Sequence, residues 1–62
     1  MPYVRVQVAG PLTRDQKKEI AKQFSNTLKE VANKPLSATY LVFEEVNREN
    51  WAIGDSLLDE RV

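Results

Sequence analysis

The sequence contains 62 residues, of which 42% are hydrophobic and 29% charged, and nine basic side chains balance nine acidic ones. This composition is typical of one globular domain over residues 1–62, and the zero net charge argues against a nucleic-acid partner bound through net positive charge. The chain has no Cys and no His. Disulfides, thiolate or imidazole metal sites, and Ser–His or Cys–His nucleophile pairs are therefore excluded.

A chain this short buries a small fraction of its surface, and small domains usually add disulfides, a metal or partner subunits. Because disulfides are excluded and Cys and His metal ligands are absent, oligomerisation is the remaining common way to stabilise such a small domain. No apolar run approaches the roughly 18 residues that suggest a membrane-spanning helix, and the N-terminus lacks a signal-peptide pattern. We therefore expect a soluble, cytoplasmic protein without a membrane partner.

Residues 3–8 alternate between apolar and polar side chains, with Val4, Val6 and Val8 on one face. A period of two with β-branched residues predicts a strand that has one buried face. The segment 9–11, Ala-Gly-Pro, predicts its end because Gly and Pro interrupt regular structure.

A helix is predicted over residues 14–32. Thr13 and Gln16 have the spacing of a capping box at its start. Asn33 suits the position after the last turn, and Pro35 prevents continuation of the helix.

One apolar stripe at helical spacing follows this predicted helix and comprises Ile20, Phe24, Leu28 and Val31. The lysines, among them Lys17, fall largely off the stripe and are interpreted as a solvated helix face rather than as an anion-binding patch.

The run 39–46 predicts a second strand, with Leu41 and Phe43 on one face. A strand, a long helix and a strand in this order favour a parallel pair joined by a right-handed crossover. Two strands and one helix form half a domain, so the free sheet edges and the apolar stripe call for a second copy.

The segment 47–55 is first polar, then aromatic, then contains Gly, which fits a short hairpin or an ordered loop. Trp51 has little core to fill after the last strand. It is interpreted either as a packing or subunit-contact residue or as a wall of a binding site. Both interpretations hold if the site lies at an interface.

Pro2 precedes the first strand. If Met1 is removed, Pro2 carries the terminal secondary amine, whereas with Met1 present its nitrogen is an amide. An α-amino group has an ordinary pKa of about 7.7–8.0, and an apolar pocket or a nearby cation lowers it. A free amine at neutral pH can take a proton from carbon. The simpler interpretation is a chain start at a strand edge, where a missing N–H costs little.

Five features occur here in an order and spacing that are specific together, although none is specific alone: Pro2, and the segments 13–18, 35–37, 43–45 and 50–54. In this arrangement the chain resembles the 4-oxalocrotonate tautomerase family over nearly its whole length. The resemblance implies an α+β fold in which a β-α-β subunit, with parallel strands and a C-terminal hairpin or loop, pairs into a four-stranded sheet with two helices. It implies a homohexamer built as a trimer of dimers, and no cofactor.

The resemblance further implies that Met1 is removed and that Pro2 acts as the general base of a tautomerase. Such an isomerase transfers a proton between the keto and enol forms of a small oxo or enol acid. Trp51 falls on the aromatic residue that lines the family's pocket. Two arginines that bind carboxylates in the family are replaced here by Leu12 and Tyr40. Neither offers a bidentate guanidinium, although the Tyr40 hydroxyl can donate one hydrogen bond to a developing enolate.

Three arginines are candidates to replace the missing pair: Arg5, Arg14 and Arg48. Arg48 lies three residues before Trp51 and is the first to test as a substrate-binding residue, although a solvated loop charge is the simpler interpretation.

Two alternatives to proton abstraction remain open. Pro2 could stay protonated as the acid of a hydratase, dehalogenase or decarboxylase, in which case activating a water would need a carboxylate such as Glu44 or Asp55. The chain could also be an oligomeric binding protein without turnover.

Overall fold

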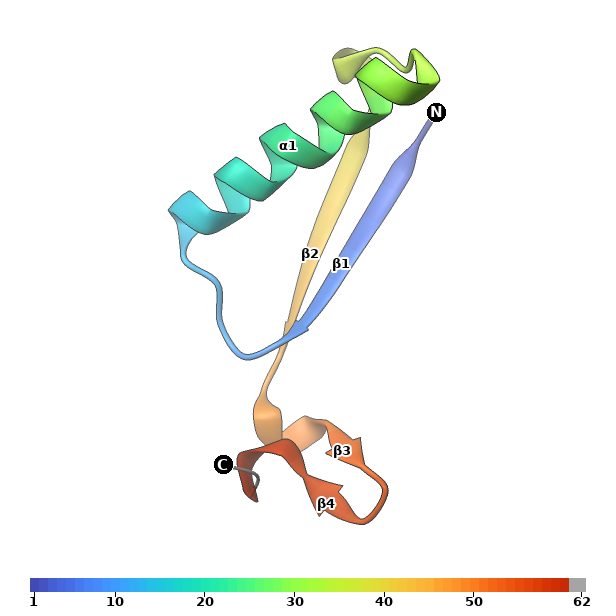
Figure 1. Cartoon of the computed structure of the whole chain (residues 1–62). Helices are drawn as coiled ribbons and strands as arrows, with labels where there is room; N and C mark the ends of the chain where they lie inside the picture. Colours follow the sequence, from blue (N-terminus) through green and yellow to red (C-terminus); the bar gives the residue numbers. More distant parts are fainter. Residues whose placement is uncertain (61–62) are drawn as a thin grey trace.

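The computed structural model describes residues 1–60. Its helix and strands are β1 (Tyr3–Ala9), α1 (Arg14–Ala32), β2 (Tyr40–Val46), β3 (Ala52–Ile53) and β4 (Ser56–Leu57). Short 3₁₀ turns span Leu36–Ala38, Arg48–Asn50 and Leu58–Glu60. Figure 1 shows α1 lying across the β1–β2 pair, with the N-terminus at one end of the strands and residues 48–60, here called the C-terminal lobe, beyond the other.

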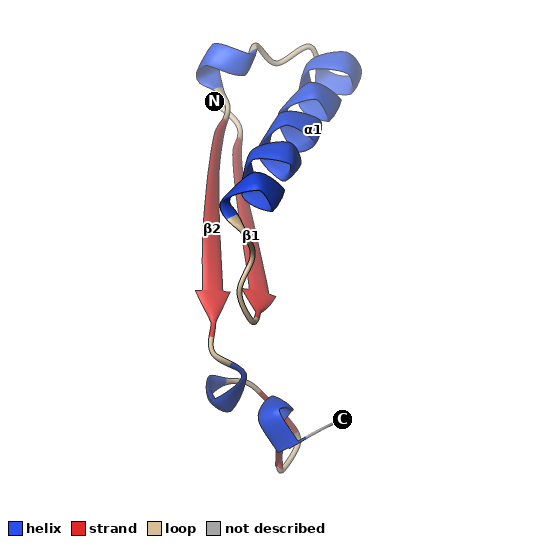
Figure 2. Ribbon diagram, turned by 90° about the vertical axis from the view of Figure 1, so that its left-hand side faces the viewer, coloured by secondary structure: helices blue, strands red, loops and turns tan. Residues whose placement is uncertain are grey.

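β1 and β2 pair in parallel, in a register that runs from Tyr3 opposite Tyr40 to Ala9 opposite Val46. This confirms the predicted β-α-β order and the parallel crossover (Figure 2). Backbone bonds outside the strands extend the pairing at both ends: the Tyr40 N–H donates to the Pro2 carbonyl at 3.0 Å, and the Gly10 N–H donates to the Val46 carbonyl at 2.8 Å. The residues just before and just after β1, Pro2 and Gly10, are therefore hydrogen-bonded to β2.

α1 has the predicted bounds and the predicted caps. The Thr13 hydroxyl accepts from the Gln16 N–H at 3.1 Å, and the Gln16 side-chain oxygen accepts from the Thr13 N–H at 2.9 Å. Asn33 ends the helix in the left-handed conformation, with φ of 56°, which Asn tolerates better than most residues. No helix in the described part of the chain, α1 included, is long and apolar enough to cross a bilayer.

The two faces of the β1–β2 pair differ. The face towards α1 is half-buried and carries Val4, Val6, Val8, Leu41 and Phe43. On the same face, Glu45 forms an ion pair with the half-buried Lys17 of α1. Lys17 thus departs from the predicted solvated face, whereas Lys18, Lys22 and Lys29 are exposed as predicted. The opposite side, called the helix-free face, carries Tyr3, Arg5, Gln7, Tyr40, Val42 and Glu44.

The single chain has no closed core: none of residues 1–60 is fully buried. Its radius of gyration is 14.8 Å, whereas a compact domain of this length has about 10.6 Å. Its accessible surface is 4997 Å², against about 4100 Å² for a folded monomer of this mass. Along the predicted stripe, Phe24 is 45% and Val31 83% exposed, so this part of the stripe is not covered within the single chain. These apolar surfaces stay exposed in the single chain.

The C-terminal lobe contains the predicted hairpin. β3 and β4 pair antiparallel, with Ala52 opposite Leu57, and Gly54 adopts a positive φ of 63° in the two-residue connection. Two further bonds close the lobe: the Leu58 N–H donates to the Trp51 carbonyl at 2.8 Å, and Arg48 Nη2 donates to the Leu58 carbonyl at 3.0 Å.

Candidate functional site

Pro2 lies immediately before β1, where the hydrogen bond from the Tyr40 N–H to its carbonyl fixes its position. Pro2 is half-buried, whereas Met1 is 85% exposed. Loss of Met1 would therefore remove little packing and would leave a terminal amine on a residue already fixed by the sheet.

Tyr40 is brought to the Pro2 end of the sheet, as a site at Pro2 requires. Its register partner is Tyr3, and the two phenols are 53% and 61% exposed on the helix-free face. Leu12, the other place where the family has arginine, precedes α1. Because a helix of 19 residues spans about 28 Å, Leu12 and Tyr40 are separated by most of the molecule within one chain.

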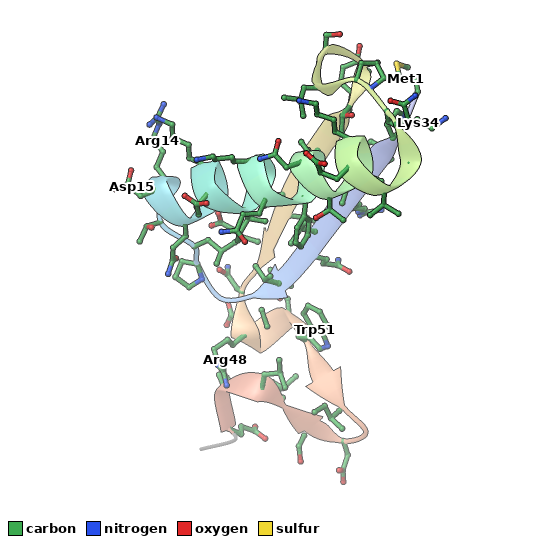
Figure 3. All side chains as sticks on the ribbon, turned by 45° about the horizontal axis from the view of Figure 1, so that its top comes forward. Met1, Arg14, Asp15, Lys34, Arg48 and Trp51 are labelled. Carbon is green, nitrogen blue, oxygen red and sulfur yellow. The ribbon has the colours of Figure 1, made fainter. Side chains whose placement is uncertain are left out.

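Trp51 lies beyond the carboxyl end of β2, at the start of the hairpin (Figure 3). It is half-buried and lines an open depression of about 230 Å³. The other residues that line this depression are Gln7, Val46, Asn50 and Ala52.

Pro2 precedes β1 and Trp51 follows β2, so the two residues lie at opposite ends of the parallel pair. Figure 3 shows Met1 and Trp51 at these two ends. β1 has seven residues, and at roughly 3.3 Å per residue it separates Pro2 and Trp51 by about 20 Å or more. A general base must lie within hydrogen-bonding distance of the proton that it takes. One chain therefore brings Tyr40 to Pro2 and holds Arg48 and Trp51 in the same lobe, but it does not bring the two groups together.

Arg48 keeps most of its donors. It is exposed, and one N–H, on Nη2, bonds to the Leu58 carbonyl. Its other donors make no bond to the described residues. Arg48 thus closes the C-terminal lobe, and its side chain lies on the other side of the lobe from Trp51 (Figure 3). Arg14 stands in the first turn of α1, well away from both Pro2 and Trp51 (Figure 3).

Arg5 forms an ion pair with Glu44 on the helix-free face. Its Nε donates to Glu44 Oε2 at 2.9 Å, its Nη2 donates to the same oxygen, and Gln7 donates to Oε1 at 3.1 Å. The hydrogen bonds from Arg5, followed by its charge, hold the pKa of Glu44 below its usual value. Glu44 in turn raises the pKa of Arg5, again mainly through the hydrogen bond.

This pairing bears on two sequence-based candidates. Arg5 has its charge neutralised by Glu44, so it is a weak substitute for a carboxylate-binding arginine. Glu44 is a poor base for activating a water, because its lowered pKa makes it less able to take a proton. Asp55, the other candidate carboxylate, is exposed in the hairpin connection. In the described part of the chain no three carboxylates gather as a metal site would require.

The fold is that of small tautomerase subunits. The family model described as "Tautomerase enzyme" matches residues 2–61, and the chain belongs to the tautomerase family.

Among proteins of similar sequence, "Probable tautomerase K2" of Dickeya dadantii is 29% identical over 62 residues, which is 98% of this chain and 92% of that protein. A "Probable tautomerase" of Bacillus cereus is 28% identical over 61 residues, covering 98% and 100%.

Solved structures agree in fold. A heterohexamer 4-oxalocrotonate tautomerase from Chloroflexus aurantiacus aligns with a TM-score of 0.88 at 24% identity, covering 100% of both chains. DmpI from Helicobacter pylori aligns with a TM-score of 0.85 at 19% identity, covering 95% of this chain and 92% of that one.

Sequence reasoning missed the pairing of Tyr3 with Tyr40, and the place of Gln7 and Asn50 beside Trp51. A signal for the first was present, since each predicted strand has a tyrosine at or near its start. For the second there was none, because the position of the lobe relative to β1 depends on tertiary contacts.

Proposed function

We propose that this protein is a tautomerase that moves a proton between the keto and enol forms of a small oxo or enol acid. Pro2, freed by removal of Met1, is the general base. The observation that carries the proposal is the fixed position of Pro2 at the amino end of β1, behind an exposed Met1, in a chain of the tautomerase family.

The reaction needs only proton transfers. The Pro2 amine takes a proton from a carbon next to the substrate carbonyl, and negative charge develops on the carbonyl oxygen. A Tyr40 hydroxyl donates a hydrogen bond to that oxygen, an interaction that strengthens as the charge grows. The Pro2 ammonium then returns the proton to another carbon of the conjugated system, or to the enolate oxygen to give the enol. In the reverse direction the Pro2 amine takes the proton from the enol hydroxyl, and the resulting ammonium delivers it to carbon.

We further propose that each site forms between copies of the chain, in a homohexamer built as a trimer of dimers. Pairing of two subunits would extend the two parallel strands to a four-stranded sheet with two helices. The exposed apolar residues support assembly, among them Phe24, Val31 and Ile53. A C-terminal lobe from a neighbour would then bring Trp51 and Arg48 to Pro2, as an aromatic wall and a cation for the substrate carboxylate.

The base is tested with Pro2→Ala, assayed with phenylenolpyruvate and with 2-hydroxymuconate. We expect kcat/KM to fall about 10²- to 10⁴-fold, the usual contribution of a positioned base. Pro11→Ala is the matched control, since Pro11 is an exposed proline in the connection before α1. A variant that retains Met1, verified by intact mass, should lose activity as Pro2→Ala does. Wild-type rates in both the Pro2→Ala protein and the protein that retains Met1 would refute the proposal.

A further inference from the structure

An exposed aromatic pair lies at the same end of the sheet as Pro2. Tyr3 and Tyr40 are register partners on the helix-free face, and partners on adjacent strands stand about 4.8 Å apart. They are 61% and 53% exposed. Tyr3 directly follows Pro2 in the sequence, and the Tyr40 N–H donates a hydrogen bond to the Pro2 carbonyl. The pair, called here the tyrosine ledge, is therefore held beside the reactive residue by the backbone.

The charge near the ledge is already neutralised. Arg5 is the next residue after Tyr3 on this face, and it donates from both Nε and Nη2 to Glu44. A carboxylate placed on the ledge would lose water without gaining a bidentate partner, which is costly. A planar apolar group would instead cover aromatic surface and stack on the rings.

We infer that the tyrosine ledge selects the substrate of this enzyme: an enol or oxo acid with an aryl substituent, in preference to a dicarboxylic dienol. The inference rests on the proposed function and names the substrate class for the same site. Tyr3 and Tyr40 receive the aryl ring beside the Pro2 amine of their own chain. The single carboxylate of such a substrate lies away from the ledge and meets a cation elsewhere in the assembled site.

The inference is tested by the ratio of kcat/KM for phenylenolpyruvate to that for 2-hydroxymuconate, measured on the assembled protein. We expect the ratio to exceed one in the wild type. Tyr3→Leu should lower it about three- to tenfold, the amount expected for one aromatic contact, mainly through KM for the aryl substrate. Tyr3→Phe, which keeps the ring and removes the hydroxyl, is the matched control and should keep the wild-type ratio.

Tyr40→Arg gives an independent second test, because it puts a guanidinium in place of a ring. We expect the ratio to shift towards the dicarboxylate by about tenfold or more, since a hydrogen bond to a charged group is stronger than a neutral one. Val42→Leu, on the same face without an aromatic ring, should leave the ratio unchanged.

Binding of unreactive acids separates failure of this inference from failure of the Pro2 mechanism. In Pro2→Ala protein, calorimetry should show tighter binding of cinnamate than of muconate, and Tyr3→Leu should remove the difference. Two results would overturn the ledge while leaving Pro2 as the base: a wild type that prefers the dienol, or a Tyr3→Leu variant in which kcat/KM falls equally for both substrates. If Pro2→Ala is fully active but cinnamate still binds on the tyrosines, the base is wrong and the ledge stands.

Discussion

The Pro2 end of the sheet and the C-terminal lobe carry different halves of the proposed site. At the Pro2 end the sheet holds the reactive residue through a backbone bond between β2 and Pro2. The lobe instead closes on itself, through Arg48, Leu58 and the Trp51 carbonyl. Each half is ordered by its own local bonds, and β1 keeps them about 20 Å apart. In the proposed assembly, the two half-sites combine between copies of the chain.

The Pro2 half can be tested alone by the pH dependence of kcat/KM. If Pro2 is a base, the rate falls about tenfold per pH unit once the pH drops below the pKa of its amine, because the protonated amine cannot accept a proton. Measurements with phenylenolpyruvate over several pH units would reveal the largest effect expected for either half. A rate that falls as the pH rises through that pKa would indicate an acid instead and would favour hydration or decarboxylation chemistry.

The separation of the halves predicts complementation between two defective subunits. Pro2→Ala and Trp51→Ala each damage a different half, and co-refolding equal amounts would leave about one quarter of the sites with both intact residues if subunits mix at random. We expect activity to rise to about a quarter of the wild-type value, well above that of either variant.

Trp51→Phe, which retains an aromatic wall, is the control for the second variant and should stay active by itself. Activity in the mixture equal to the average of the two variants would mean that one chain completes its own site, and that the two halves do not combine between copies.

The lobe half is tested with Arg48→Ala. Arg48 donates one hydrogen bond to the Leu58 carbonyl. Its loss should therefore loosen the lobe and remove the cation that the lobe contributes in the proposed assembly. We expect KM for phenylenolpyruvate to rise about tenfold, with a smaller change in kcat, since a hydrogen bond to a charged group contributes roughly 1.5–3 kcal/mol.

Arg48→Lys should restore part of the KM, because it keeps the charge without the planar fork. Lys22→Ala, an exposed cation on α1, serves as the control. If Arg48→Ala lowers thermal stability and leaves KM at the wild-type value, Arg48 acts only as a link within the lobe.

Local pattern predicted the elements of this fold well, and tertiary contact decided what it missed. The alternation of residues 3–8, the Thr13–Gln16 capping box and Asn33 specify their structures through neighbours in the chain, so the helix and both long strands have nearly the expected bounds. The prediction for Lys17 failed because its partner, Glu45, lies on another element. Exposed Val31 shows the same limit, since a stripe indicates that a face will be covered but not which chain covers it.

For the site, the sequence singled out Pro2, Tyr40, Trp51 and Arg48 but could not place them. The distance between Pro2 and Trp51 follows from the parallel register and from the direction in which the chain leaves β2. Both are properties of the folded chain. Side-chain pairing across strands, such as that of Arg5 with Glu44, likewise depends on which residues the register sets opposite each other.

The smallest predicted effect is on stability, and it comes from the Arg5–Glu44 ion pair on the sheet between the two half-sites. Because Arg5 lowers the pKa of Glu44 in the folded protein, their pairing adds stability above the unfolded-state pKa of about 4.3 and loses it as the pH falls through the lowered folded value. Glu44→Gln should therefore lower the melting temperature slightly at pH 7 and leave it nearly unchanged at pH 2, at matched protein concentration. Glu49→Gln, at an exposed position without an ion pair among the described residues, should change neither value. An equal fall in melting temperature at both pH values would mean that Glu44 stabilises the sheet by packing and not through its charge.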